Sequence, residues 1–492
     1  MRFRETAIVS GGLLAQQASV FATGILTARL LGSDGYGVLG ILKSLATVLV
    51  IITPLGLDLA LLKHASFYRD RPAELQETAR ALRLVVAVCN VLLLALVAAC
   101  VGPWLAGIYD NIPRFATLCV ITMLGLLFAA DVQVSSALYR VSGRVVRFSL
   151  VVNYCQPALR FLLSAAVLVM GGGVESVTWV STVMFVYAFV MLAWADRGTR
   201  VAPIGLPVRL LARKIAAILS ESLWMALSLL VYQSIRLADV LILAALAGPS
   251  IAGEYAAMSS VAQLIQIYPN AISQTLGPRI AQAYRSGDRE DLVAALKDYL
   301  RKAAILGGYL FGGIAIFGQD LSFVFGPNFH FAWQLPILLA TGWYLSATLA
   351  PFGYVLSMTG RHKQELAILT CGALLLIVAL LALVPALKAV GTALAVAIVF
   401  AVVNAARCSY VIRIIGRNPL GLEDLVAPLC FLAVAWACRM AGGLAMSPSL
   451  GGLIIECVAY SVLAAAVVLT VIGSAEERRM VVSRFRLGRA LP

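Results

Sequence analysis

The stretch from Leu366 to Leu387, LAILTCGALLLIVALLALVPAL, contains no charged residue. As an α-helix it would be long enough to cross about 30 Å of hydrocarbon. Apolar stretches of similar length recur along the whole chain of 492 residues, which is 61% hydrophobic and only 13% charged. This composition, with a mean hydropathy of +0.93, lies outside the range of water-soluble globular domains. The sequence therefore predicts an integral membrane protein.

The recurrence of such stretches predicts about fourteen transmembrane helices. Ten-residue segments of alternating hydrophobicity are absent, so the expected fold class is all-α. The first apolar stretch is too long for a signal peptide and has no clear cleavage site, so it counts as a helix. The expected helix centres are residues 18, 48, 94, 126, 158, 184, 230, 265, 309, 344, 376, 400, 432 and 462.

The distribution of basic residues supports this helix count. Cytoplasmic loops of membrane proteins are enriched in Lys and Arg. With both termini in the cytoplasm, 31 of the 38 basic residues fall on the cytoplasmic side, and a missed helix would scatter them. The others fall on the outer side (Arg29, Arg114, Lys388, Arg439) or within apolar stretches (Lys43, Arg160, Arg236).

The net charge of +14 and the nine cysteines require no special partner. Cytoplasmic Lys and Arg beside a bilayer face anionic headgroups, so membrane lipids, and no nucleic acid, are the expected partners of this charge. The cysteines lie in or beside apolar stretches without C-x-x-C spacing, and the three histidines lie far apart in the sequence. We therefore predict no metal site, no cofactor and no catalytic motif.

Short segments between the apolar stretches reveal an internal repeat. Gly143-Arg144 recurs as Gly360-Arg361, and Tyr68-Arg69 recurs as Tyr284-Arg285, so the residue numbers are offset by 217 in the first match and by 216 in the second. This offset corresponds to six helices, an even number, so both copies should enter the membrane in the same direction.

The repeat predicts two six-helix lobes in a parallel pseudo-repeat, followed by two additional helices. The expected boundaries are residues 1–195 for the first lobe, 196–214 for a cytoplasmic linker, 215–417 for the second lobe, 418–474 for the added helix pair and 475–492 for a basic cytoplasmic tail.

Residues 28–37, Ala-Arg-Leu-Leu-Gly-Ser-Asp-Gly-Tyr-Gly, resemble the A-R-x-L-G-x-x-x-Y-G segment that ends helix one in polysaccharide and O-antigen flippases of the Wzx type. Residues 56–58, 278–281 and 359–361 are similar to further segments of that family, in the same order. The resemblance covers about residues 5–415. These flippases belong to the multidrug/oligosaccharidyl-lipid/polysaccharide exporter superfamily.

The resemblance implies two six-helix bundles that form a V. It implies a cargo of undecaprenyl-diphosphate-linked oligosaccharide, moved across the bacterial inner membrane for lipopolysaccharide or exopolysaccharide biosynthesis, with a polysaccharide polymerase as a further partner. In related lipid II flippases, two extra helices form a groove for the lipid tail, and the pair after Gly421 is the counterpart to expect here.

Two other interpretations are open. Small-molecule, MATE-like exporters of the same superfamily usually have twelve helices and an acidic residue in helix one, whereas no acidic residue lies between Thr6 and Leu31. A membrane-embedded polymerase or ligase for the same lipid-linked sugars would need a large outer loop with catalytic residues, and every outer loop is short. We therefore expect a transporter and not an enzyme.

Polar residues within apolar stretches are the candidate substrate contacts, because a charge at the bilayer centre costs about 2.5–3.5 kcal/mol on insertion scales. Arg160 lies near the centre of its expected helix, on one predicted face with Asn153 and Gln156. Its guanidinium can bind a diphosphate through a fork of donors, and the alternative is a structural arginine satisfied by helix C-termini or by Asp131. Lys43 is a second candidate anion contact, with snorkelling to headgroups as the alternative.

Uncharged polar residues form stripes along the helices centred near residues 265 and 18. Spacings of three and four residues place Gln263, Gln266 and Asn270 on one helical face. Such a face suits sugar hydroxyls or hydrogen bonds between helices. A similar stripe runs from Gln16 to Thr27, and the family resemblance makes Arg29 a candidate at the outer mouth.

Two acidic residues in the helix centred near residue 230 are candidates for coupling transport to a proton or to sodium. Glu221 has no opposite charge one turn away within its helix, so it is the candidate for proton binding. Asp239 lies three residues after Arg236, and helix packing is the alternative explanation for that pair.

Overall fold

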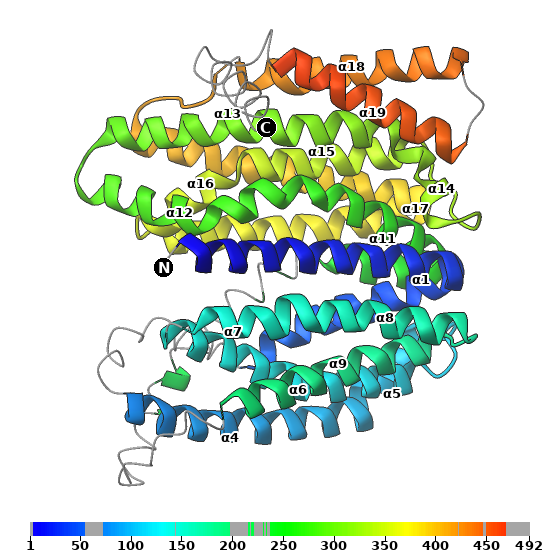
Figure 1. Ribbon diagram of the computed structural model, residues 1–492. Helices are drawn as coiled ribbons and strands as arrows, with labels where there is room; N and C mark the ends of the chain where they lie inside the picture. The colour runs from blue at the N-terminus through cyan, green and yellow to red at the C-terminus, as the bar shows by residue number, and fades with distance from the viewer. Residues whose placement is uncertain are drawn as a thin grey trace, which may run out of the picture. The chain divides into compact units, whose positions relative to one another are not determined.

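The computed structural model describes residues 3–54, 72–142, 144–196, 215–216, 218–220, 230, 233, 237–421, 423–445 and 449–468. Every regular element in this part of the chain is helical (Figure 1), so the predicted all-α fold class is confirmed. The elements of the first half are α1 (Phe3–Ile52), α4 (Pro72–Leu96), η1 (Val97–Val101), α5 (Gly102–Ile108), α6 (Phe115–Val141), α7 (Val145–Ser149), η2 (Leu150–Cys155), α8 (Gln156–Val169) and α9 (Val174–Ala195).

The second half begins with three helical segments that follow one another directly, and it ends with two separate helices. Its elements are α11 (Pro249–Ala262), η4 (Gln263–Gln266), α12 (Ile267–Arg285), α13 (Arg289–Phe317), η5 (Gly318–Leu321), α14 (Ser322–Phe325), α15 (Gln334–Thr348), α16 (Ala350–Met358), α17 (His362–Ile415), α18 (Glu423–Ala445) and α19 (Leu450–Val467).

Ten helices in the described residues are long and apolar enough to cross a membrane. This finding confirms a multi-pass membrane protein. Two of the ten, α1 and α17, each consist of two helices joined at a non-helical residue, Gly32 and Lys388. The expected helix centred at residue 265 is α11–η4–α12, and most of the one centred at residue 230 lies outside the described residues. The total of fourteen therefore stays a prediction.

The helix boundaries repeat with the offset found in the sequence. α4 begins at residue 72 and α13 at residue 289, while α7 begins at residue 145 and α17 at residue 362, so the starting numbers in both pairs differ by 217. Gly32, where α1 breaks, has φ 71°, and Gly248, which lies at the matching place of the second copy just before α11, has φ 87°. Both positions need glycine because other residues pay a steric cost at positive φ.

The chain divides into two compact units, residues 1–253 and 254–492. The second sequence repeat therefore begins within the first unit. The lobe boundaries expected from the repeat, at residues 195, 215 and 417, stay a prediction.

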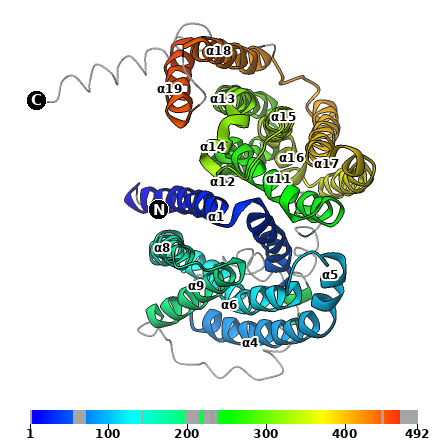
Figure 2. The same ribbon diagram turned by 90° about the vertical axis from the view of Figure 1, so that its right-hand side faces the viewer.

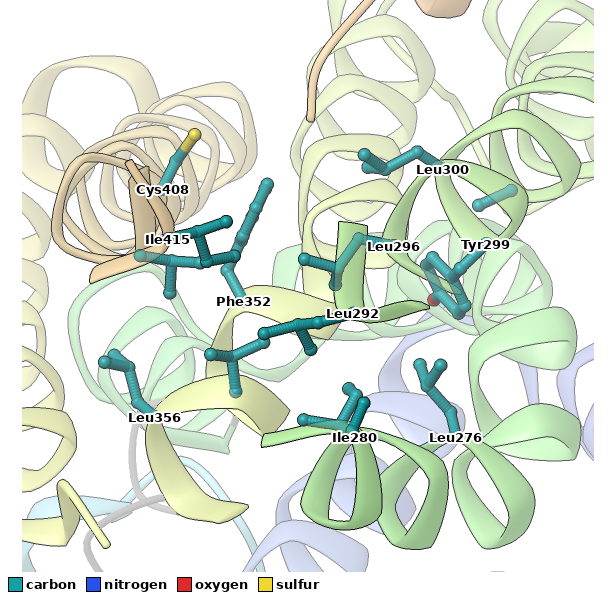
Figure 3. Packing of buried hydrophobic residues seen from close by; sticks show 14 residues of the cluster. Leu276, Ile280, Leu292, Leu296, Tyr299, Leu300, Phe352, Leu356, Cys408 and Ile415 are labelled. Carbon is teal, nitrogen blue, oxygen red and sulfur yellow. The ribbon is translucent and has the colours of Figure 1, made fainter. Parts of the chain in front are cut away.

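The largest described core cluster of the second unit lies where α12, α13, α16 and α17 meet (Figure 3). Ile280, Leu296 and Phe352 are fully buried in it. The Tyr299 hydroxyl, also buried here, donates a 2.8 Å hydrogen bond to the Ala347 carbonyl oxygen. This bond removes the cost of burying an unpaired hydroxyl. The cluster packs these four helices of the second unit against one another.

The two C-terminal helices pack against α13, and they lie beside it in both ribbon views (Figure 1, Figure 2). A Cβ added at Gly312 would lie 2.8 Å from the Phe431 carbonyl carbon, so α13 and α18 are in backbone contact. The rings of Tyr309 and Tyr460 stack at 5.1 Å, and Tyr460 donates a hydrogen bond to the Tyr309 carbonyl oxygen. Small residues that allow such close approach are typical of helix contacts in membranes.

Within the first unit, α1 crosses the beginning of α11 immediately after its break. The Ser33 and Ser250 hydroxyl oxygens, at equivalent places in the two copies of the repeat, lie 2.8 Å apart. A Cβ added at Gly37 would lie 1.8 Å from the Pro249 carbonyl oxygen, and one at Gly253 would lie 2.1 Å from the Ser33 carbonyl oxygen. Only glycine is compatible with this crossing.

Candidate functional site

The helix that carries Arg160 contains a local widening. The π-helical segment η2 ends at Cys155, two residues before Pro157, and η1 likewise ends at Val101, two residues before Pro103. A proline ring clashes with the carbonyl four residues earlier in a regular α-helix and lacks a donor N–H. A π turn at this point lets the chain continue as a helix, and such turns are frequent at functional sites.

Arg160 is half-buried on α8 and has no charged partner among the described residues. Its Nε atom is buried without a hydrogen-bond partner, as is the hydroxyl of Ser164 one turn further along. Leaving a buried donor unpaired costs about 1–3 kcal/mol. Lys43, an exposed residue of α1, lies near enough to Arg160 for the two charges to repel. The first unit thus brings together two cations that would be stabilised by an anion.

Asp131, the carboxylate that could have neutralised Arg160, is engaged elsewhere. Arg83 Nε on α4 lies 3.2 Å from Asp131 Oδ1 on α6, and Arg83 also donates a 2.6 Å hydrogen bond to the Ser135 hydroxyl. The alternative of an Arg160–Asp131 pair is therefore wrong. Arg83 and Asp131 form a structural pair between two helices of the first unit.

Asn153 and Gln156 precede Arg160 in the sequence and contact different helices. The Asn153 amide donates to the Ser149 hydroxyl at 3.1 Å, and its Cβ would lie 3.1 Å from a Cβ added at Gly12 on α1. The Gln156 amide donates to the Met184 carbonyl oxygen on α9 at 3.2 Å. Both side chains contribute to packing, and substrate contact through them stays a prediction.

The hydroxyls of the α1 stripe are bonded within the protein. Thr23 and Thr27 donate to carbonyls one turn earlier in α1. Ser19 donates to the Pro157 carbonyl oxygen at 2.7 Å, which places α1 against α8 one turn from Arg160. Arg29 is exposed just before the break in α1, and its role in substrate binding stays a prediction.

The amide stripe on the helix α11–η4–α12 includes a short 3₁₀ segment at Gln263–Gln266. Gln263 and Asn270 are exposed, whereas Gln266 is half-buried. The Gln263 amide donates to the Ser259 hydroxyl at 3.2 Å, and the Gln266 amide lies 3.5 Å from the Trp343 carbonyl oxygen on α15. A 3₁₀ turn within a long helix often marks a functional position.

The structure constrains the two ion-coupling candidates unequally. Glu221 and Arg236 lie outside the described residues. Asp239 is buried, and its Oδ1 atom accepts a 2.8 Å hydrogen bond from the Val240 backbone N–H. Ion coupling through either carboxylate stays a prediction.

An ion triad in the second unit escaped the sequence analysis. Arg439 Nη1 on α18 lies 2.9 Å from Asp320 Oδ2 on η5 and 3.1 Å from Glu456 Oε2 on α19. The three residues lie far apart in the sequence, so no helical spacing could have indicated their contact. The triad ties both C-terminal helices to the end of α13.

Replacing Arg439 with methionine should strongly destabilise the protein, because it leaves two poorly exposed carboxylates facing each other. Removing one partner of a buried ion pair costs about 3–5 kcal/mol. The matched control is Arg114→Met, since the Arg114–Glu175 pair is exposed and its atoms are 3.8 Å apart, so its loss should cost less than about 1 kcal/mol. Thermal unfolding in detergent measures both changes, and equal stability of the two variants would contradict this prediction.

The sequence is similar to a known protein family and to a curated membrane protein. The family model described as "Polysaccharide biosynthesis protein" matches residues 3–284, more than half of the chain. This protein belongs to that family. Among curated proteins, the "Uncharacterized membrane protein EpsK" of Bacillus subtilis (strain 168) is 29% identical over 262 residues. That match covers 50% of each chain, so the aligned region spans half the length of this relative.

Solved structures share the fold of most of this chain. The lipid II flippase MurJ in an inward closed conformation has a TM-score of 0.69 at 12% identity, over 95% of this chain and 100% of that one. An inward-facing multidrug resistance MATE family transporter of the MOP superfamily has a TM-score of 0.66 at 15% identity, over 82% and 94% of the two chains. These likenesses show that this protein shares the fold of these two transporters.

Proposed function

We propose that this protein is a flippase that translocates an undecaprenyl-diphosphate-linked oligosaccharide across the bacterial inner membrane. The cargo moves from the inner to the outer leaflet by alternating access and supplies lipopolysaccharide or exopolysaccharide biosynthesis. Both termini are cytoplasmic in this proposal, a proton or sodium supplies the coupling, and a polysaccharide polymerase consumes the product.

The single observation that carries the proposal is the unneutralised cation pair in the first unit. Arg160 has a buried, unpaired Nε atom, and Lys43 lies close enough to repel it. A guanidinium binds phosphate oxygens in a bidentate manner, and an ammonium adds a second point charge. A diphosphate supplies enough negative charge to stabilise both cations at once.

The fold shared with MATE transporters favours a second candidate, export of small molecules. The cation pair argues against a cationic cargo, because no described carboxylate neutralises Arg160 and its neighbour Lys43 adds to the repulsion. An anionic amphiphile remains the better match to this site.

Deletion of the gene in the source bacterium tests the proposal. We expect the undecaprenyl-diphosphate-linked oligosaccharide to accumulate on the cytoplasmic leaflet and surface polysaccharide to be lost, with both defects reversed by a plasmid-borne copy. Leaflet location is measured by accessibility of the glycan to a glycosidase in spheroplasts and in inverted vesicles.

Other outcomes of the deletion would overturn the proposal. Accumulation of the same lipid on the outer leaflet would indicate a polymerase or ligase. Unchanged surface polysaccharide, with increased sensitivity to a toxic small molecule, would indicate a small-molecule exporter.

A further inference from the structure

The helix α11–η4–α12 exposes different chemistry from the other long helices of the second unit. The exposed faces of α17, α18 and α19 carry large apolar side chains such as Leu374, Leu429 and Ile454, which suit contact with lipid. The helix α11–η4–α12 exposes Gln263 and Asn270 on either side of Ile267. It is long enough to span a membrane, yet it is not among the ten apolar spans.

The direction of this polar face follows from the packing of the opposite face. Ile265, Leu276 and Ile280 are buried and contact the neighbouring helices α13, α15 and α16. Gln263 and Asn270, two helical turns apart, lie on the other side of the helix. Polar side chains in a membrane are costly against lipid, so such residues normally face water or a polar cargo.

Gln263 is arranged to bind a group that can donate a hydrogen bond. Its amide nitrogen donates to the Ser259 hydroxyl, whereas its side-chain carbonyl oxygen has no hydrogen-bond partner among the described residues. An amide offers both donors and an acceptor, and a hydroxyl can complement either. The geometry thus leaves an acceptor on the exposed face.

The polar side chains of this face carry no charge. No charged residue lies between Tyr255 and Pro278. With the repeat offsets of 216 and 217, Lys43 of the first copy corresponds to Ser259 or Ser260 of the second. The first copy therefore presents a cation where the second presents neutral hydrogen-bonding groups.

We propose that the amide face of α11–η4–α12, defined by Gln263 and Asn270, binds the sugar hydroxyls of the cargo. This proposal rests on the proposed function, in which the cation pair of Arg160 and Lys43 takes the diphosphate. Specificity for the glycan then resides in the second copy of the repeat.

Binding of two lipids to the purified full-length protein separates the two roles. The probes are undecaprenyl diphosphate without sugar and the undecaprenyl-diphosphate-linked oligosaccharide extracted from the deletion strain. Gln263→Leu should weaken binding of the glycosylated lipid roughly tenfold, as expected for one lost hydrogen bond, and leave binding of undecaprenyl diphosphate unchanged. Arg160→Ala should weaken binding of both lipids.

A matched control lies one turn along the same exposed face. Ile267 is 45% exposed, and Ile267→Leu should change neither affinity. Equal loss of both lipids in Gln263→Leu, or no loss of either, would overturn the sugar site. If Arg160→Ala binds both lipids normally while Gln263→Leu keeps its selective defect, the diphosphate site fails and the sugar site stands.

Discussion

Arg160→Ala should abolish translocation while the protein remains folded and inserted. Arg160 has no ion-pair partner among the described residues, so its removal breaks no described salt bridge and relieves the repulsion with Lys43. A desolvated cation is costly, but its attraction to phosphate strengthens in the same low dielectric. Surface polysaccharide, measured at equal expression, reports the loss.

The conservative variant Arg160→Lys distinguishes charge from geometry. Lysine keeps the positive charge but loses the planar fork of donors, so we expect part of the activity to survive. The control is Arg147→Ala, because Arg147 is exposed on α7, in the same membrane span, and its loss should leave transport unchanged. Full activity of Arg160→Ala would remove Arg160 from the site, and loss of folded protein would assign it a structural role.

The features that the sequence predicted correctly depend on composition and spacing along the chain. Uncharged stretches such as residues 366–387 show that the chain spans the membrane, and the offset shared by several loop motifs shows that it repeats. These signals are local or periodic, so they survive without knowledge of packing. The helix starts at residues 145 and 362 then reproduce the offset in the structure.

Composition and spacing along the chain could not predict the contacts between helices. Spacing identifies only neighbours three or four residues apart on one helix. The Arg83–Asp131 pair and the Arg439 triad join different helices, so only packing shows them. The sequence did contain a signal for the π-helical segment before Arg160, because Pro157 lies within that apolar stretch and a proline interrupts regular α-helical bonding.

Spacing also could not predict which residues of the uncharged polar stripes are exposed. An α-helical wheel places Asn153 and Gln156 near one another, yet one contacts α1 and the other bonds to α9. In the stripe from residue 263 to 270, burial separates Gln266 from Gln263. Which polar side chains are exposed depends on the neighbours of each helix, and this information made Gln263 the strongest candidate for sugar binding.

Gly253→Leu should prevent the crossing of α1 and α11 and abolish transport. A Cβ at position 253 would lie 2.1 Å from the Ser33 carbonyl oxygen, and both atoms belong to the backbone or are fixed to it. Neither can rotate away, so the helices must move apart. Overpacking of this kind typically costs about 1–3 kcal/mol, and leucine adds further volume. We expect Gly253→Ala to give the same defect in milder form.

Disulfide formation between cysteines at positions 33 and 250 measures directly whether α1 and α11 still cross. Their hydroxyl oxygens are 2.8 Å apart, so cysteines at both positions, in a protein lacking its nine native cysteines, should form a disulfide on oxidation. Adding Gly253→Leu should sharply reduce the disulfide yield. The control is Gly107→Leu, because a Cβ at Gly107 would meet nothing within 4 Å and the same increase in size should leave both yield and transport unchanged. Normal transport and normal cross-linking in Gly253→Leu would contradict this prediction, since the clash would then have been absorbed without opening the crossing.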